Sequence, residues 1–404
     1  MRIDLYKALR MVARAVDLVS PALSGHHERT ACLYACIGNA MGISAPQMRN
    51  GFIAAMVHDI GGLSEAARLA PLAMVDIDTD VHARIGALLM SRVSILSQAE
   101  GIVYHHHTPW RRHTEDIPEE SHILYLADRV DVMMNTLAAV RAGGQRDYLQ
   151  AAASVRTAII NAAGDRFSPA ASAAFLEISR PAAFWLALEP SSLADESERL
   201  SPLIRETISL TEFNELASLP ASVLDSHSRS TARHSHAVAV IASRLGQALG
   251  YSGVDCLKLS IAGRLHDLGK LAIPATLLDY PGKLTATERT SIKRHAWITW
   301  ELLSAVSGAE DIALWAGSHH ETSQGTGYPH GVPADTLPEA CRIITVADMW
   351  SALCQDRPYR KGLTENGCTG NYGAVSDFSS RPETTEGTGV AYTWGDDVCT
   401  TLIG

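Results

Sequence analysis

An internal duplication of histidines and aspartates is the feature that most constrains how this chain can fold. The pairs His58-Asp59 and His266-Asp267 lie 208 residues apart, and the same offset carries His26 onto His234. Each half continues with a single histidine, two adjacent histidines beginning 24 residues later, and an aspartate. In the first half the run His105-His106-His107 allows either neighbouring pair to supply the ligands. The matched residues are His26, His58, Asp59, His82, His106, His107 and Asp128 in the first half, and His234, His266, Asp267, His295, His319, His320 and Asp348 in the second. Histidines that only filled a core would not recur in register, so we predict two similar units that each carry metal-ligand residue types.

The apolar residues of both halves recur at helical spacing. After His234, the residues Val238, Ile241 and Leu245 share one helix face, which places His234 near the buried start of that helix. Further along, Thr285 and Glu288 have the spacing of an N-cap and its third helical residue. The sequence therefore predicts an all-α protein that consists of two tandem helical bundles.

Composition changes mark the expected domain boundaries. A polar, acidic stretch at residues 191–205 is predicted to be a linker between a first bundle at 1–190 and a second bundle at 206–363. Residues 364–404 contain eight threonines and seven glycines and show no helical period. We predict an irregular tail there, and its origin in a frameshift is an open alternative.

The overall composition is that of a globular protein, with 46% hydrophobic and 19% charged residues. A net charge of −10 argues against a general nucleic-acid surface. No apolar run approaches the roughly 18 residues of a membrane span, and no signal peptide opens the chain, so a cytoplasmic protein without a membrane segment is expected. The seven cysteines form no CxxC pair, as expected of reduced thiols.

Five segments of the second half resemble an HD-GYP domain, which is a branch of the HD phosphohydrolases. They are His234-Ser235-His236-Ala237-Val238, His266-Asp267-Leu268-Gly269-Lys270, Pro281-Gly282-Lys283-Leu284-Thr285, His319-His320-Glu321 with Gly327-Tyr328-Pro329, and Asp356-Arg357-Pro358-Tyr359-Arg360. The resemblance implies an all-helical HD-type bundle that holds two or three metals and hydrolyses cyclic di-GMP. Iron or manganese is the metal that it implies, with zinc, nickel and magnesium as alternatives.

The resemblance also implies which residues surround the metals. His234, His266, Asp267 and Asp348 would hold one ion, while His295, His319 and His320 would hold a second, with Asp267 bridging the two. Members with a third metal carry a glutamate where this chain has Ser230, so two ions are expected. Two metals about 3.5–4 Å apart can activate a shared water and clamp a phosphate.

Contacts to the substrate are likewise implied by the resemblance. Lys270, a catalytic residue together with Asp267, would contact a phosphate, as would Arg357 and Arg360. Tyr328 would shape the guanine pocket or a surface for a signalling protein partner. Two departures from the family pattern, Gln324 and Thr322, leave substrate choice open, so cyclic GMP-AMP is the alternative substrate.

The first copy keeps the ligand residue types but lacks the substrate contacts. Gly62 stands in place of Lys270, Thr108 in place of Glu321, and Leu137 and Val140 in place of the two arginines. We therefore predict a catalytically silent unit that is still able to hold metal, and histidines packed without metal are the open alternative.

Three functions compete for the whole chain. The first is a cyclic dinucleotide phosphodiesterase in bacterial second-messenger signalling, regulated or braced by its N-terminal copy. The second is an inactive receptor for metal and nucleotide, and the third is a phosphohydrolase of mononucleotides. The sequence leaves homodimerisation open.

Overall fold

The computed structural model describes residues 2–63, 80–138, 147–228, 234–322, 324–333 and 336–354. Several predictions fall outside these residues: the roles of Arg357 and Arg360, the position of Ser230, the loss of a basic residue at Val140, and the irregular tail at 364–404. They stay predictions.

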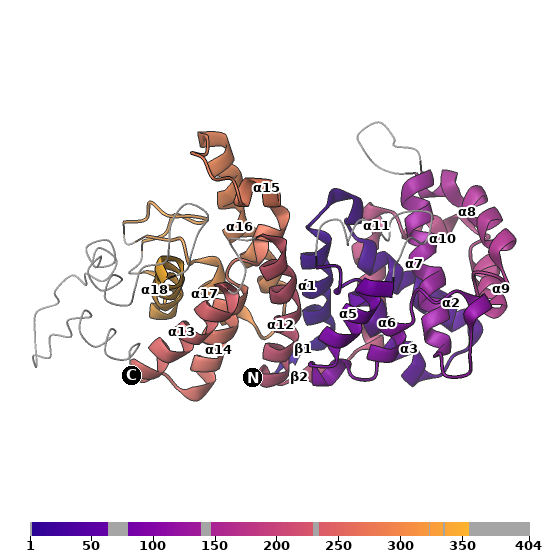
Figure 1. The fold of residues 1–404 in the computed structure, drawn as a ribbon, viewed down its shortest axis with the longest axis horizontal. Coiled ribbons are helices and arrows are strands. Elements are labelled where there is room, and N and C mark those ends of the chain that lie inside the picture. The colour runs from indigo at the N-terminus through magenta and orange to yellow at the C-terminus, as the bar shows by residue number, and fades with distance from the viewer. Residues whose placement is uncertain are drawn as a thin grey trace, which may run out of the picture. The chain divides into compact units, whose positions relative to one another are not determined.

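The predicted all-α architecture is confirmed (Figure 1). Among the described residues, the sheet content is one antiparallel pair, β1 (Ile3–Asp4) with β2 (Thr207–Ile208). The chain divides into two compact units, Arg2–Leu219 and the residues from Pro220 onward, which we call the first and second units. No described helix combines the length and apolar character needed to cross a bilayer.

The first unit is arranged around one helix, α2 (His26–Met41). This helix packs against α1, α3, α7, α9 and α11, and its first ten residues are all buried, including His26, His27, Glu28 and Arg29. Polar groups so placed need partners, because burying an unpaired charge costs several kcal/mol. The other elements of this unit are α1 (Leu5–Asp17), η1 (Pro21–Leu23), α3 (Ala45–Val57), α5 (Asp80–Met90), η3 (Ser94–Leu96), α6 (Glu100–Tyr104), η4 (Trp110–Arg112), α7 (Glu119–Leu137), α8 (Tyr148–Ala162), α9 (Pro169–Ile178), α10 (Ala182–Ala187), α11 (Pro190–Leu200) and η5 (Ser201–Leu203).

The second unit begins within α12 (Leu210–His227). Its further elements are α13 (His234–Ala248), α14 (Gly253–Leu265), η6 (Leu268–Ala272), α15 (Ala275–Leu278), α16 (Ala286–Ser304), α17 (Glu310–Gly317) and α18 (Glu339–Cys354). Helix α13 packs against α14 and α18, while α16 packs against α17 and η6. The expected start at His234 is confirmed, and so is the cap at Thr285, whose hydroxyl accepts from the backbone N–H of Glu288.

The stretch predicted as a linker is helical through Leu200. Pro190 occupies the first turn of α11, where its missing N–H costs nothing. Leu193 and Ser197 are buried, and the Ser197 hydroxyl hydrogen-bonds Tyr6 at 2.7 Å. The acidic residues are thus the solvated face of an amphipathic helix, which composition alone did not distinguish from a linker.

Candidate metal centres

The candidate ligands of the second unit are brought together from five helices or their ends. His234 opens α13, His266 and Asp267 directly follow α14, and His295 lies within α16. The adjacent histidines 319 and 320 follow α17, and Asp348 lies in α18. All seven predicted ligands therefore lie close together in the bundle, although they are spread over more than a hundred residues of the chain.

The first group of ligand atoms has the dimensions of a single metal site. Nε2 of His234 lies 3.0 Å from Oδ1 of Asp348 and 3.9 Å from Oδ2 of Asp267. Nε2 of His266 lies 3.2 Å from that same Asp267 oxygen. Metal–ligand bonds of about 2.0–2.2 Å place neighbouring ligand atoms roughly 3–3.5 Å apart, so these four side chains can share one ion.

A second group of ligand atoms faces the other oxygen of Asp267. Oδ1 of Asp267 is 3.3 Å from Nε2 of His295 and 3.7 Å from Nε2 of His319, and the two nitrogens are 3.3 Å apart. His320 completes a group with these two histidines. Oδ1 of Asp267 is buried and has no hydrogen-bond partner in the described structure. Its two oxygens therefore face two separate groups, as a bridging carboxylate requires.

The histidine rings are oriented by the main chain. Nδ1 of His266, His295 and His319 donates to the carbonyl three residues earlier, at 2.8, 2.6 and 2.6 Å. Because a carbonyl only accepts, Nδ1 carries a proton in each ring and Nε2 is the nitrogen that faces the site. A neutral ring in this tautomer can coordinate a metal through Nε2.

The pKa values of the histidines also bear on whether they can bind a metal. Burial lowers the pKa of His295, His319 and His320 to about 3, so these rings are neutral at pH 7. Burial also opposes charge on His266, but Asp267 and Asp348 outweigh it and raise its pKa to about 10. That ring must lose its proton before Nε2 can bind a metal.

Lys270 lies at the edge of this centre, where the side chain is 22% exposed. Its ammonium donates to Oδ2 of Asp267 at 2.5 Å. Burial would raise the pKa of Asp267, but the charges of His266 and Lys270 outweigh burial and hold that pKa well below its usual range. The ammonium therefore lies beside the carboxylate that faces both groups of histidines.

Glu321 holds the loop that contains Gly327-Tyr328-Pro329 beside the candidate centre, a role that was not predicted from the sequence. Its buried carboxylate accepts from the backbone N–H groups of His330 at 2.6 Å, Gly331 at 3.1 Å and Val332 at 3.2 Å. The loop in turn places the Tyr328 ring 4.7 Å from that of His320. The signal available in the sequence was the glutamate directly after the paired histidines, together with its replacement by Thr108 in the copy that lacks the loop.

A glycine follows the His-Asp pair in both units for the same physical reason. A Cβ on Gly269 would collide with the backbone of His295, and a Cβ on Gly61 would collide with the backbone carbonyl of His82. Each glycine thus lets the helix that carries the next ligand histidine approach the His-Asp turn.

We therefore expect Gly269→Ala to disturb the second centre. The added methyl group must push α16 away, at a cost of about 1–3 kcal/mol, and should weaken metal binding through His295. Denaturant unfolding and metal analysis measure both effects. Gly253→Ala is the control, because a Cβ there meets open space. Wild-type stability and metal content in Gly269→Ala would contradict the close-packing argument.

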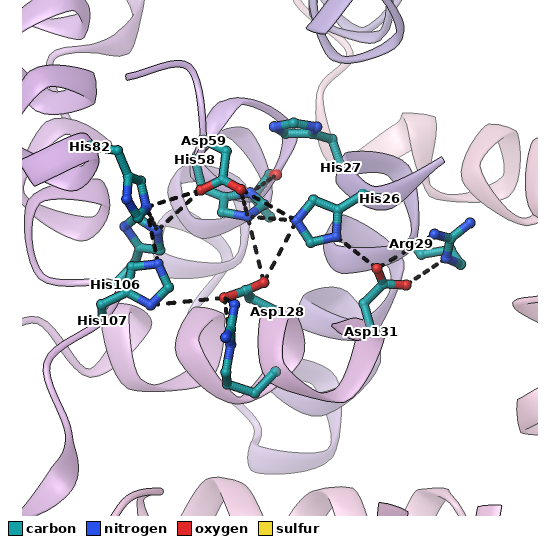
Figure 2. Close-up of polar contacts among 12 residues, drawn as sticks. His26, His27, Arg29, His58, Asp59, His82, His106, His107, Asp128 and Asp131 are labelled. Carbon is teal, nitrogen blue, oxygen red and sulfur yellow. Dashed lines mark hydrogen bonds and ion pairs between the residues drawn. The ribbon is translucent and has the colours of Figure 1, made fainter. Parts of the chain in front are cut away.

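The first unit assembles the equivalent residues (Figure 2). Nε2 of His26 lies 3.6 Å from Oδ2 of Asp59 and 3.6 Å from Oδ1 of Asp128, and 3.2 Å from Nε2 of His58. On the other side, Oδ1 of Asp59 is 3.2 Å from Nε2 of His82. His106 and His107 complete this second group. The bridging geometry is therefore repeated around Asp59.

Both halves of the chain match sequence profiles of known proteins, and the two profiles have the same description. Sequence profiles described as HD domain match residues 23–133 and residues 215–368. The chain is 28% identical to 3′3′-cGAMP-specific phosphodiesterase 1 of Vibrio cholerae over 90% of its own length and 86% of that protein. It is 40% identical to a cyclic di-GMP phosphodiesterase response regulator of Xanthomonas campestris, over 33% of this chain and 34% of that protein.

A solved structure shares the fold of the chain. It is a cyclic GMP-AMP specific phosphodiesterase of V. cholerae, with a TM-score of 0.66 and 20% identity, covering 100% of this chain and 97% of that one. The similarity supports the arrangement of helices described above.

Proposed function

This chain contains two HD domains, and we propose that the second is a metal-dependent phosphodiesterase that hydrolyses a cyclic dinucleotide. The observation that carries the proposal is Asp267, whose two oxygens face two separate groups of histidines while Lys270 contacts the same carboxylate. Two buried atoms that find no hydrogen-bond partner among the described residues, Nε2 of His266 and Oδ1 of Asp267, support the fit to metal. The mixed histidine and carboxylate donors suit iron, manganese or zinc.

The proposed roles of the residues follow from their positions. His234, His266 and Asp348 would hold one ion, and His295, His319 and His320 the other, with Asp267 shared between them. Two divalent ions so held would supply an activated water and neutralise phosphate charge. Lys270 would stabilise the negative charge that develops on the phosphate oxygens. Tyr328, held by the Glu321-anchored loop, would border the base pocket.

The substrate class is a cyclic dinucleotide, either cyclic di-GMP or 3′3′-cyclic GMP-AMP. Relatives named for each substrate are similar to this chain, and the relative matched over most of its length is named for 3′3′-cGAMP. Gln324 and Thr322, which depart from the family pattern, lie beside the Gly-Tyr-Pro loop and are the residues we expect to influence the choice.

The test is turnover by the full chain loaded with Mn²⁺ or Fe²⁺. Cyclic di-GMP, 3′3′-cyclic GMP-AMP and a mononucleotide are supplied separately, and products are separated chromatographically. We expect a linear dinucleotide from at least one cyclic substrate. Metal-bound protein that binds the cyclic dinucleotides without cleaving them would instead identify a receptor, and phosphate release from the mononucleotide alone would identify a different hydrolase.

A further inference from the structure

The candidate centre of the first unit is more enclosed than that of the second. All seven of its ligand residues are buried, with His82 the most exposed at 5%. In the second unit the Asp348 side chain is 19% exposed and that of Lys270 is 22% exposed. A substrate phosphate can reach only a centre with an accessible side, so the two centres differ in what they can bind.

A buried arginine occupies one side of the first centre. The Arg129 guanidinium donates to Oδ2 of Asp128 from Nη2 at 2.8 Å and from Nε at 3.0 Å, and the residue is 3% exposed. Oδ1 of Asp128 stays directed toward His26. The residue after Asp348 in the second unit is Met349. In the first unit the buried Arg129 therefore contacts Asp128. The equivalent carboxylate of the second unit, Asp348, is partly exposed.

The two centres also differ in the group behind their first histidine. Nδ1 of His26 donates to Oδ2 of Asp131 at 2.7 Å, and Nε of Arg29 holds the other oxygen of Asp131 at 2.5 Å (Figure 2). Nδ1 of His234 pairs instead with the Ser351 hydroxyl at 3.0 Å. A carboxylate behind a ligating histidine fixes the ring and makes its other nitrogen a stronger ligand than a hydroxyl does.

The carboxylate between the two groups of the first unit, Asp59, is buried among histidines. Both oxygens of Asp59 and Oδ1 of Asp128 are buried without a hydrogen-bond partner in the described structure. Arg129 and Arg29 donate to Asp128 and Asp131, and the groups that face Asp59 at short range are histidines. Burying a carboxylate is costly, and a pair of divalent ions held by Asp59 and these histidines would offset that cost.

We infer that the first unit retains divalent metal ions in a closed, non-catalytic centre, and that Asp131, held by Arg29, makes this centre the more retentive of the two. Arg129 and the burial of the ligands exclude a phosphodiester, so the metals brace the bundle around α2. This inference is independent of the proposed hydrolysis, because it concerns metal retention alone.

The experiment measures Mn²⁺ in the full chain carrying Asp267→Ala, which removes the second centre. After equilibration and desalting, this protein should hold close to two ions, and the further change Asp59→Ala should remove them. Mn²⁺ should also raise the melting temperature of the Asp267→Ala protein, since binding to the native state alone stabilises it. An Asp267→Ala protein that binds no Mn²⁺ and shows no such shift overturns the inference, whatever the wild type hydrolyses.

A second experiment tests the role of Asp131 in metal affinity. In the Asp267→Ala background, Asp131→Ser installs the residue type found at Ser351 and should weaken Mn²⁺ affinity in a chelator competition by about 10–100-fold. Asp116→Ser changes an exposed aspartate of the same unit and should leave the affinity unaltered. If the protein with both Asp131→Ser and Asp267→Ala bound Mn²⁺ as tightly as the protein with Asp267→Ala alone, the assignment of Asp131 would be overturned.

Discussion

Replacing Asp267 by alanine in the full chain should lower cyclic dinucleotide hydrolysis by at least about 10³-fold, because the change would remove the carboxylate proposed to be shared by two metal ions, and with it the activated water and phosphate clamp that they would supply. Oδ2 of Asp267 lies 3.2 Å from His266 and Oδ1 lies 3.3 Å from His295, so both groups of histidines lose the carboxylate between them and the first keeps only Asp348. The rate is measured by product formation, and metal analysis should show the loss of about two ions.

The matched variant for this prediction is Asp59→Ala, which alters the equivalent residue of the first unit. It should retain a rate within about threefold of wild type, since Gly62 stands in place of Lys270 there and the candidate ligand residues of the first unit are all buried. Appreciable hydrolysis by Asp267→Ala, or its loss in an Asp59→Ala protein that still holds two metals, would contradict the assignment of catalysis to the second unit.

Removing the Lys270 amine should reduce kcat/KM by about 10²-fold while leaving the metals bound, because a positioned cation stabilises charge that develops in the transition state. The ammonium now donates to Oδ2 of Asp267 at 2.5 Å, and its partial exposure lets it reach a substrate. Lys270→Ala is compared with wild type in steady-state kinetics and in metal content. The retained metal distinguishes this variant from a ligand substitution.

Lys258→Ala is a suitable control for the loss of a lysine from the second unit. Lys258 pairs with Asp311 at 2.7 Å on the surface of the unit, and it contacts none of the ligand residues in the described structure. Its removal should leave kcat/KM unaltered. A Lys270→Ala enzyme with wild-type kcat/KM would refute the phosphate contact, and one without metal would show that Lys270 acts by organising the centre.

Much of the architecture could be predicted because it is encoded in local patterns. Val238, Ile241 and Leu245 indicated a helix, and α13 extends from His234 to Ala248. The His-Asp pairs and paired histidines recurred in register, and each set of seven does converge in the structure. That these residues bind metal ions stays a prediction.

Other features depend on tertiary contacts that periodicity does not encode. Asp131 and Ser351 occupy the same place behind their histidines but differ in chemistry, so the duplication did not single them out. The bonds of Glu321 to three backbone N–H groups exist only once the loop has folded back. The helix α11 escaped prediction because its apolar face consists of few residues, among them Leu193.

Metal titration of activity tests whether the second unit hydrolyses a cyclic dinucleotide at a two-metal centre. The Asp59→Ala protein, whose first centre is disabled, is stripped with a chelator and supplied with increasing Mn²⁺ while cyclic dinucleotide turnover is recorded. Turnover should be negligible without metal and should reach its plateau at close to two ions per chain. Full activity in the stripped protein, or a plateau at one ion, would rule out catalysis at a two-metal centre.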